Sequence, residues 1–210
     1  MKRIYKYIFL NYVVPIFRTF AVYVGFDRKY LSGRYFDQSL LGWRWVLRAI
    51  LIQKILGFNR HVPWPVSPSN AIDDPSGIIF DPDDLQNFMH HGCYLSNVNG
   101  GKIIIGKGTV IAPNVGIITT NHKLDNMSIH MPSKNVVIGN NCWLGMNSVL
   151  LPGVYLGENT VVAAGAIVNS SHPEGWCVLG GSPAKILKQI PRPECPLIDN
   201  RLVYHDDVNH

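Results

Sequence analysis

Residues 138–168 read IGNNCWLGMNSVLLPGVYLGENTVVAAGAIV, and a six-residue period runs through them. Every sixth residue is aliphatic, and these residues are Ile138, Leu144, Leu150, Leu156, Val162 and Val168. The same register continues upstream at Ile105, Ile111 and Ile117. The residue directly after each aliphatic one is mostly small, as at Gly139, Gly145 and Gly157.

A period of six residues is typical of a parallel β-helix. Each unit of six forms one short strand and a turn, and three units complete a triangular coil whose aliphatic side chains stack inside. We expect the small residue that follows to turn the corner, where glycine tolerates unusual backbone dihedrals. A β-sandwich would instead show turn signals every 8–12 residues. The period therefore predicts an all-β fold, a parallel β-helix over residues 101–190.

The period breaks once, between Ile117 and Ile138. The intervening loop, taken here as 118–137, is polar and includes Asn121, His122 and Asp125. A polar excursion from a regular scaffold is where functional residues are usually found. We therefore expect the site on this loop.

Residues 1–60 carry eleven Lys and Arg residues and two acidic ones, a formal charge of +9, whereas residues 61–210 carry −4. Apolar residues recur near helical spacing between Leu40 and Ile55, so this part is expected to form amphipathic helices. The longest uncharged stretch, residues 7–17, has eleven residues, and a spanning helix needs about twenty. No clear cleavage site for a signal peptide follows it.

The basic helical region 1–60 predicts a cytoplasmic protein held peripherally on the cytoplasmic face of an anionic membrane. Packing of these helices on the β-helix or on other subunits is the open alternative, and no motif supports nucleic-acid binding. Residues 61–100 are rich in proline and are expected to be an irregular segment leading into the β-helix. Residues 191–210 form a C-terminal tail. The four cysteines lack metal-binding spacing and are expected to be small buried residues.

Three stretches together resemble the hexapeptide-repeat acyltransferases, over residues 100–190. They are GKIIIGKGTVIAPNVGIITTNH (101–122), VVIGNNCWLGMNSVLLPGVYLGENTVVAAGAIV (136–168) and GGSPAKILKQI (180–190). The motifs are most similar to sugar O-acetyltransferases of the maltose and galactoside types and to xenobiotic acetyltransferases. The resemblance implies a left-handed β-helix, a homotrimer, acetyl-CoA as co-substrate without a metal, and active sites between subunits. It predicts acetyl transfer to a sugar hydroxyl, in a cell-envelope or surface polysaccharide precursor.

By this resemblance His122 is the catalytic base. A sugar hydroxyl is a poor nucleophile at neutral pH, and a neutral imidazole can take its proton as it attacks the thioester. Asn121 and Asp125 match the NH-x-x-D pattern of the xenobiotic branch, so Asp125 would orient the imidazole or bind the acceptor, with plain solvation as the alternative. Further acceptor candidates are Asn99, His91 and Asn97, for which a structural role is the alternative.

The residues that the resemblance assigns to CoA lie downstream. Trp143 matches a residue that flanks the pantetheine arm. The candidates beside that arm are Gly145, Ala164 and Gly165, because small residues suit a close approach of the backbone. The candidates for the phosphates are Asn169, Ser170, Lys185 and Lys188. Asn169 and Ser170 stand where relatives often have Thr-Lys, so one cationic contact is absent. The alternative interpretation is a coil corner for the small residues, subunit packing for Trp143, and a solvated helical tail for the two lysines.

Other functions remain as alternatives. The acceptor could be an antibiotic or serine instead of a sugar, and a non-catalytic, membrane-associated scaffold is a second alternative. A γ-class carbonic anhydrase is disfavoured because His122 and His130 are eight residues apart and do not form the HxxxxH pair of its zinc site. A nucleotidyltransferase is disfavoured because residues 1–100 have no room for a nucleotide-binding domain.

Overall fold

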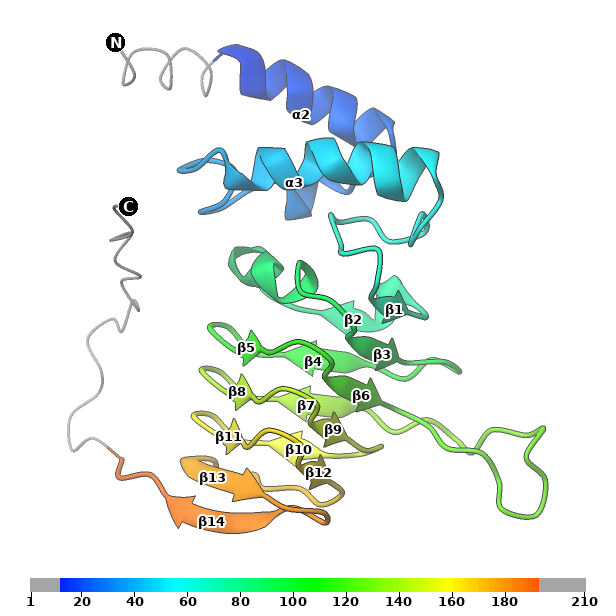
Figure 1. Ribbon diagram of the computed structural model, residues 1–210, viewed down its shortest axis with the longest axis vertical. Coiled ribbons are helices and arrows are strands. Elements are labelled where there is room, and N and C mark those ends of the chain that lie inside the picture. The colour runs from blue at the N-terminus through cyan, green and yellow to red at the C-terminus, as the bar shows by residue number, and fades with distance from the viewer. Residues whose placement is uncertain (1–11, 193–210) are drawn as a thin grey trace.

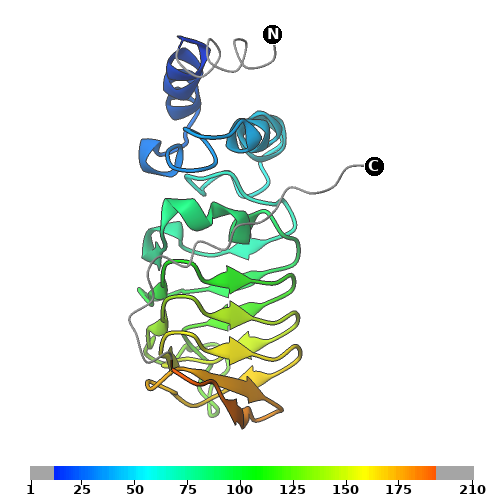
Figure 2. The same cartoon turned by 90° about the vertical axis from the view of Figure 1, so that its left-hand side faces the viewer.

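The computed structural model describes residues 12–192, and in it the chain forms a triangular prism of stacked coils with helices over one end (Figures 1 and 2). The first face is a sheet of β1 (Ala71–Ile72), β3 (Tyr94–Ser96), β6 (Gly116–Ile118), β9 (Val149–Leu150) and β12 (Ile167–Val168). The second contains β2 (Ile78–Ile79), β4 (Ile103–Ile105), β7 (Val136–Ile138) and β10 (Tyr155–Leu156). The third contains β5 (Val110–Ile111), β8 (Trp143–Leu144), β11 (Val161–Val162), β13 (Cys177–Gly180) and β14 (Lys185–Gln189).

Strands pair in parallel within each face, except that β14 returns antiparallel to β13. The chain visits the three faces in turn, so each of the middle coils adds one strand to each sheet. This arrangement confirms the parallel β-helix that the six-residue period predicts. Lys185 and Lys188 lie on β14, so the strand replaces the helical tail considered for them.

The period corresponds to the interior of the prism. Each aliphatic residue of the series, from Ile105 to Val168, is at most 4% exposed. The residues four positions later are buried as well, and they are Thr109, Val115, Cys142, Ser148, Val154, Thr160 and Ala166. Large aliphatic and small or β-branched residues therefore alternate around the inner wall and fill it without leaving space for a ligand.

The corners differ from the prediction about glycine. Gly145, directly after an inward Leu144, has an ordinary φ, and a Cβ there would lie 2.6 Å from the backbone nitrogen of Ala164 in the next coil. The small residue is therefore required by close coil stacking. The left-handed dihedrals lie three positions after each aliphatic residue instead, at Gly108, Asn114, Asn141, Asn147, Gly153, Asn159 and Gly165. Asn and Gly are the residues that tolerate this region best.

The β-helix also begins earlier than residue 101. The segment 61–100 supplies β1, β2 and β3, and their inward residues include Ile72, Ile78 and Leu95. In the third face of this first coil a 3₁₀ helix, η5 (Pro82–Phe88), replaces a strand. The Asn87 amide donates to the Thr109 carbonyl (2.8 Å) and accepts from the Ile111 nitrogen (2.9 Å), which covers the edge of β5. The connections between the strands of this coil are longer and rich in proline, so its inward residues do not recur at every sixth position throughout.

The N-terminal region forms α2 (Val14–Tyr23), α3 (Leu41–Ala49) and the shorter helices η2 (Arg28–Tyr30) and η3 (Ile50–Ile55), whereas η4 (Pro75–Gly77) lies between β1 and β2. We call residues 12–60 the helical cap. It joins the prism through an aromatic cluster of Tyr30, Trp64, Phe80 and Phe88, whose neighbouring ring centroids are 4.5 to 5.2 Å apart. These contacts bury the open end of the first coil.

Leu156→Ala should test the interior directly. Leu156 is fully buried, so truncation removes packing and leaves a cavity, and we expect unfolding to become easier by about 2–5 kcal/mol. Leu187→Ala makes the same chemical change on β14 at a residue that is 66% exposed. Thermal and denaturant unfolding should rank the two variants. Equal losses would contradict the inward assignment of Leu156.

Candidate functional site

The loop between β6 and β7 is a hydrogen-bonded hairpin that projects from one edge of the prism (Figure 1). Backbone bonds run from Lys134 nitrogen to Thr119 oxygen (2.7 Å), from Met131 nitrogen to Asn121 oxygen (2.7 Å) and from Lys123 nitrogen to Ile129 oxygen (2.8 Å). We call residues 119–135 the hairpin. It starts and ends at the corner between the first and second faces.

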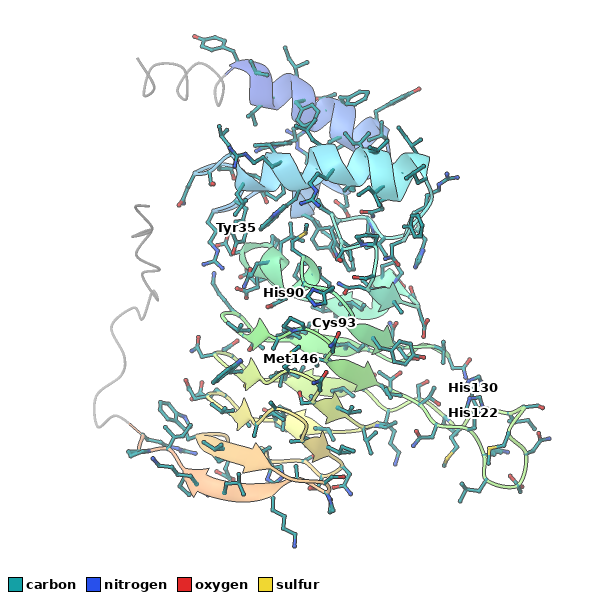
Figure 3. The ribbon with its side chains drawn as sticks, in the orientation of Figure 1. Tyr35, His90, Cys93, His122, His130 and Met146 are labelled. Atoms are coloured by element: carbon teal, nitrogen blue, oxygen red, sulfur yellow. The ribbon has the colours of Figure 1, made fainter. Side chains whose placement is uncertain are left out.

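His122 lies on the ascending strand of the hairpin and is exposed. It stands opposite His130 in an antiparallel bridge, and the two imidazole centroids are 4.3 Å apart with the rings tilted by 36° (Figure 3). Sequence reasoning missed this partner. A signal was present, because the turn-forming pair Asp125-Asn126 lies midway between the two histidines.

Asn121 and Asp125 are exposed on the same hairpin. Asn121 contributes its backbone carbonyl to the hairpin, and Asp125 lies in the turn. Within residues 12–192, no hydrogen bond or ion pair joins Asp125 to His122. An orienting role of Asp125 therefore has no direct contact to support it in the isolated chain.

The remaining acceptor candidates lie in three different places. Asn97 is fully buried, its amide nitrogen donates to the Asp74 oxygen (2.7 Å), and its amide oxygen accepts from the Asp74 nitrogen (3.0 Å). This is the structural role, and the side chain does not reach the surface. Asn99 is exposed at the corner from which the hairpin rises. His91 is exposed at a different corner, between the third and first faces.

Trp143 and Lys188 share the third face. The register pairs Trp143 with Val161, Val161 with Val178, and Val178 with Lys188, so the four residues form one row across the sheet. Trp143 is 54% exposed on the outer side. With strands about 4.8 Å apart, Trp143 and Lys188 lie roughly 14 Å from each other on this face.

The small residues lie at the corner between the third and first faces. A Cβ at Gly165 would meet nothing within 4 Å, and its neighbour Ala164 is exposed. Gly145 is buried and its small size is already explained by coil stacking. Asn169 and Ser170 are exposed after β12, at the corner below the hairpin. Lys185 is exposed at the start of β14.

The structure thus divides the candidates into two groups. His122, Asn121, Asp125 and Asn99 gather at the hairpin corner, and the CoA candidates Asn169 and Ser170 lie at the same corner after β12. Trp143, the lysines, Ala164, Gly165 and His91 lie on the third face or at its corner. A filled prism separates the two groups within one chain. They can act on one molecule only if a second copy supplies one of them.

The cysteines fit the structural interpretation. Cys93, Cys142 and Cys177 are free and buried, whereas Cys195 lies outside the described residues. Burial raises the pKa of the Cys93 and Cys142 thiols, which disfavours the reactive thiolate at neutral pH.

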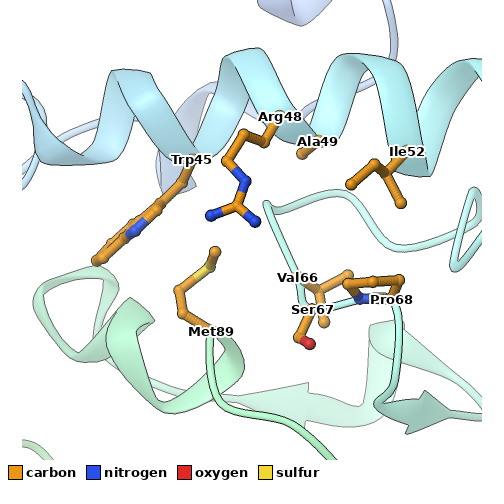
Figure 4. Close-up of a pocket in the computed structure, with 8 residues that line it drawn as sticks. All are labelled: Trp45, Arg48, Ala49, Ile52, Val66, Ser67, Pro68 and Met89. Atoms are coloured by element: carbon orange, nitrogen blue, oxygen red, sulfur yellow. The ribbon is translucent and has the colours of Figure 1, made fainter.

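The helical cap holds a cleft of its own, between α3 and the first coil (Figure 4). Trp45, Arg48, Ile52 and Met89 are among its lining residues. The cleft contains none of the predicted site residues. No helix within residues 12–192 is both long and apolar enough to cross a bilayer.

Comparison with known proteins gives consistent similarities. The family model for bacterial transferase hexapeptide (six repeats) matches residues 135–170. A putative acetyltransferase of Schizosaccharomyces pombe is 31% identical over 147 residues, which cover 68% of this chain and 68% of the relative. The galactoside O-acetyltransferase of Escherichia coli is 35% identical over 99 residues, 46% of this chain and 48% of the relative.

A putative lipopolysaccharide biosynthesis O-acetyl transferase of Escherichia coli is 35% identical over 125 residues, 54% of this chain and 61% of the relative. The chain thus spans between 48% and 68% of the length of these three relatives. The family match at residues 135–170 lies within the β-helix, from β7 to just after β12.

Asn97→Ala should separate a structural role from an acceptor contact. Loss of the side chain leaves the buried backbone groups of Asp74 without partners, so we expect a loss of about 1–3 kcal/mol in unfolding free energy. Asn99→Gly is the control, because Asn99 is exposed with φ of 58°, which glycine adopts freely. Denaturant unfolding measures both. An unaffected Asn97→Ala variant would refute the structural assignment.

Proposed function

The chain belongs to the bacterial hexapeptide-repeat transferase family, and we propose that it transfers an acetyl group from acetyl-CoA to a sugar hydroxyl. The observation that carries this proposal is the exposed His122, placed on the hairpin where the repeat is interrupted. Relatives named as galactoside and lipopolysaccharide O-acetyltransferases support a sugar acceptor, in an envelope or surface glycan precursor.

The proposed reaction needs one proton acceptor. The His122 imidazole takes the proton of the acceptor hydroxyl while the oxygen attacks the thioester carbonyl. The carbon–sulfur bond then breaks, the acetyl group stays on the oxygen, and the imidazolium returns its proton to the CoA thiolate. Histidine is the side chain best suited to exchange a proton in this way near neutral pH.

The third face would hold CoA. Trp143 offers a flat apolar surface to the pantetheine arm, and the open backbone at Ala164 and Gly165 leaves room beside it. Lys188 shares the row of Trp143, and Lys185 lies at the start of the same strand, so both can meet phosphates as point charges. Asn169 and Ser170 lie at the hairpin corner, so they would add polar contacts only to CoA held by the third face of a neighbouring copy.

We propose a homotrimer because one chain cannot assemble this site. Packing the third face of one subunit beside the hairpin of the next would bring Trp143 of one copy to His122 of another. The same packing would give His91, at the corner of the third face, access to an acceptor held by Asn99, Asn121 and Asp125. Closed rotational symmetry repeats such a contact at every interface.

Mixing two impaired variants, assayed at an acetyl-CoA concentration below the wild-type KM, tests the shared site. His122→Ala should lower transfer by about 10²–10⁴-fold, and Trp143→Ala should raise the KM for acetyl-CoA. Co-refolded one-to-one mixtures should regain activity, since about a quarter of the interfaces in a ring would join two unaltered residues. The assay follows free thiol released from acetyl-CoA with galactosides and maltose as acceptors. Full activity of His122→Ala would refute the catalytic assignment, and absence of complementation would refute the shared site.

The helical cap supports peripheral membrane association. Both helices keep apolar side chains in solvent: on α2 Ile16 is 75% and Phe20 48% exposed, and on α3 and η3 Leu47 is 57%, Leu51 56% and Ile55 62% exposed. An exposed apolar surface of this extent marks an interaction site. Exposed Arg44 lies on the same side of α3 as Leu47 and Leu51, and a basic, apolar helix face suits an anionic bilayer.

The trimer would strengthen this contact. Subunits related by an axis parallel to their prisms carry their caps at the same end, so three weak sites would act together. An acceptor linked to a membrane lipid would then be close to the hairpin. The hairpin follows β6, which is only two strands away from β1 in the first face.

Vesicle flotation tests the cap surface. Wild-type protein should float with phosphatidylglycerol vesicles, float less with phosphatidylcholine, and detach in high salt. The double variant Leu51→Gln/Ile55→Gln should lose most of this binding while keeping acetyl transfer to soluble sugars. Leu187→Gln is the control, an exposed apolar residue on β14. Equal flotation of the double variant, or a change in its oligomeric state, would contradict membrane docking.

A further inference from the structure

His122 and His130 occupy a special position in the hairpin. Hydrogen bonds between residues 121 and 131 and between 123 and 129 flank the pair, so 122 and 130 face each other at a non-hydrogen-bonded position. At such positions the Cα atoms are about 4.5 Å apart and the side chains are closest. The imidazole centroids lie 4.3 Å from each other.

A base on an exposed hairpin needs help to stay in place. Residues 121–132 are all exposed, so neither the prism nor the coil interior packs against the His122 ring in the isolated chain. A general base must stay within hydrogen-bond reach of the proton that it takes. A free side chain would lose rotamer entropy when it adopts that geometry. A neighbouring side chain that already packs against the ring lowers this entropy loss.

We propose that His130 is the positioning residue for His122, which rests on the proposed role of His122 as the base. The rings meet face against face at a tilt of 36°, and within the described residues no hydrogen bond links them. The contact therefore restricts the His122 ring while leaving its nitrogens free for the hydroxyl. A flat ring at position 130 is sufficient for this role, and its own proton transfer is not required.

The strand that carries His130 is anchored to the prism. Ser133 Oγ donates to the Val98 carbonyl in the preceding coil (2.7 Å), which joins the strand to the prism. Thr120 Oγ1 on the ascending strand donates to the Met131 carbonyl (2.7 Å), which joins the two strands of the hairpin. Both bonds lie within three residues of His130. The descending strand therefore provides a fixed support against which the His122 ring can rest.

Two substitutions at position 130 test the proposal in the full-length protein. His130→Ala removes the ring, and we expect kcat to fall by about 10- to 100-fold with little change in KM, because the base is misplaced. His130→Phe keeps a flat ring that can stack, so it should stay within about threefold of wild type. Thiol release from acetyl-CoA with galactosides and maltose measures all three proteins. Wild-type kcat in His130→Ala, or an equal loss in His130→Phe, would overturn the positioning role.

A second measurement does not depend on catalysis. Diethyl pyrocarbonate modification of His122, followed by mass spectrometry without substrates, reports how accessible and mobile the ring is. His122 should react several-fold faster in His130→Ala than in wild type, and at the wild-type rate in His130→Phe. An unchanged rate in His130→Ala would overturn the ring contact. If His122→Ala instead keeps full transfer, the proposed function fails while the modification rates still decide the contact.

Discussion

Successive coils of this protein lie in close backbone contact at the corners that follow the second and third faces, and this constraint governs the remaining structure. A Cβ at Gly139 or Gly145 would come within 2.6 Å of the backbone of the next coil. The contact fixes the register between coils, so that inward aliphatic side chains stack on one another. It also aligns the left-handed Asn and Gly residues along the same edges. The result is a filled prism, stabilised mainly by aliphatic burial.

A filled prism has no internal cavity for chemistry, so functional groups must lie on its faces or on excursions from it. The chain uses both places. The hairpin carries His122 away from one edge, and the third face carries Trp143 and Lys188 in one row. Because the faces of a prism point in different directions, these groups would meet only between copies, as in the proposed trimer. Convexity of the single chain thus supports the proposed shared site.

The two ends of the prism are finished differently. At the C-terminal end β14 folds back on β13 and pairs with its free edge. At the N-terminal end η5 and the aromatic cluster around Trp64 cover the first coil, and the helical cap lies above them. The cap uses its buried aromatic residues for this contact and leaves Leu51 and Ile55 in solvent. A layer with one face on the protein and apolar residues outside fits a peripheral attachment.

Sequence alone determined the β-helix, its inward residues and the interruption that carries His122, because side chains at fixed spacing repeat the same environment in every coil. It missed the first coil, whose longer connections remove the period, and it assigned left-handed dihedrals to the wrong corner position. Only the tertiary structure decided that Asn97 is structural, that His130 contacts His122, and that the two candidate groups lie on separate faces. Those facts depend on which strands pair and which faces meet. The sequence offered a signal only for the His130 contact, in the turn-forming pair midway between the two histidines.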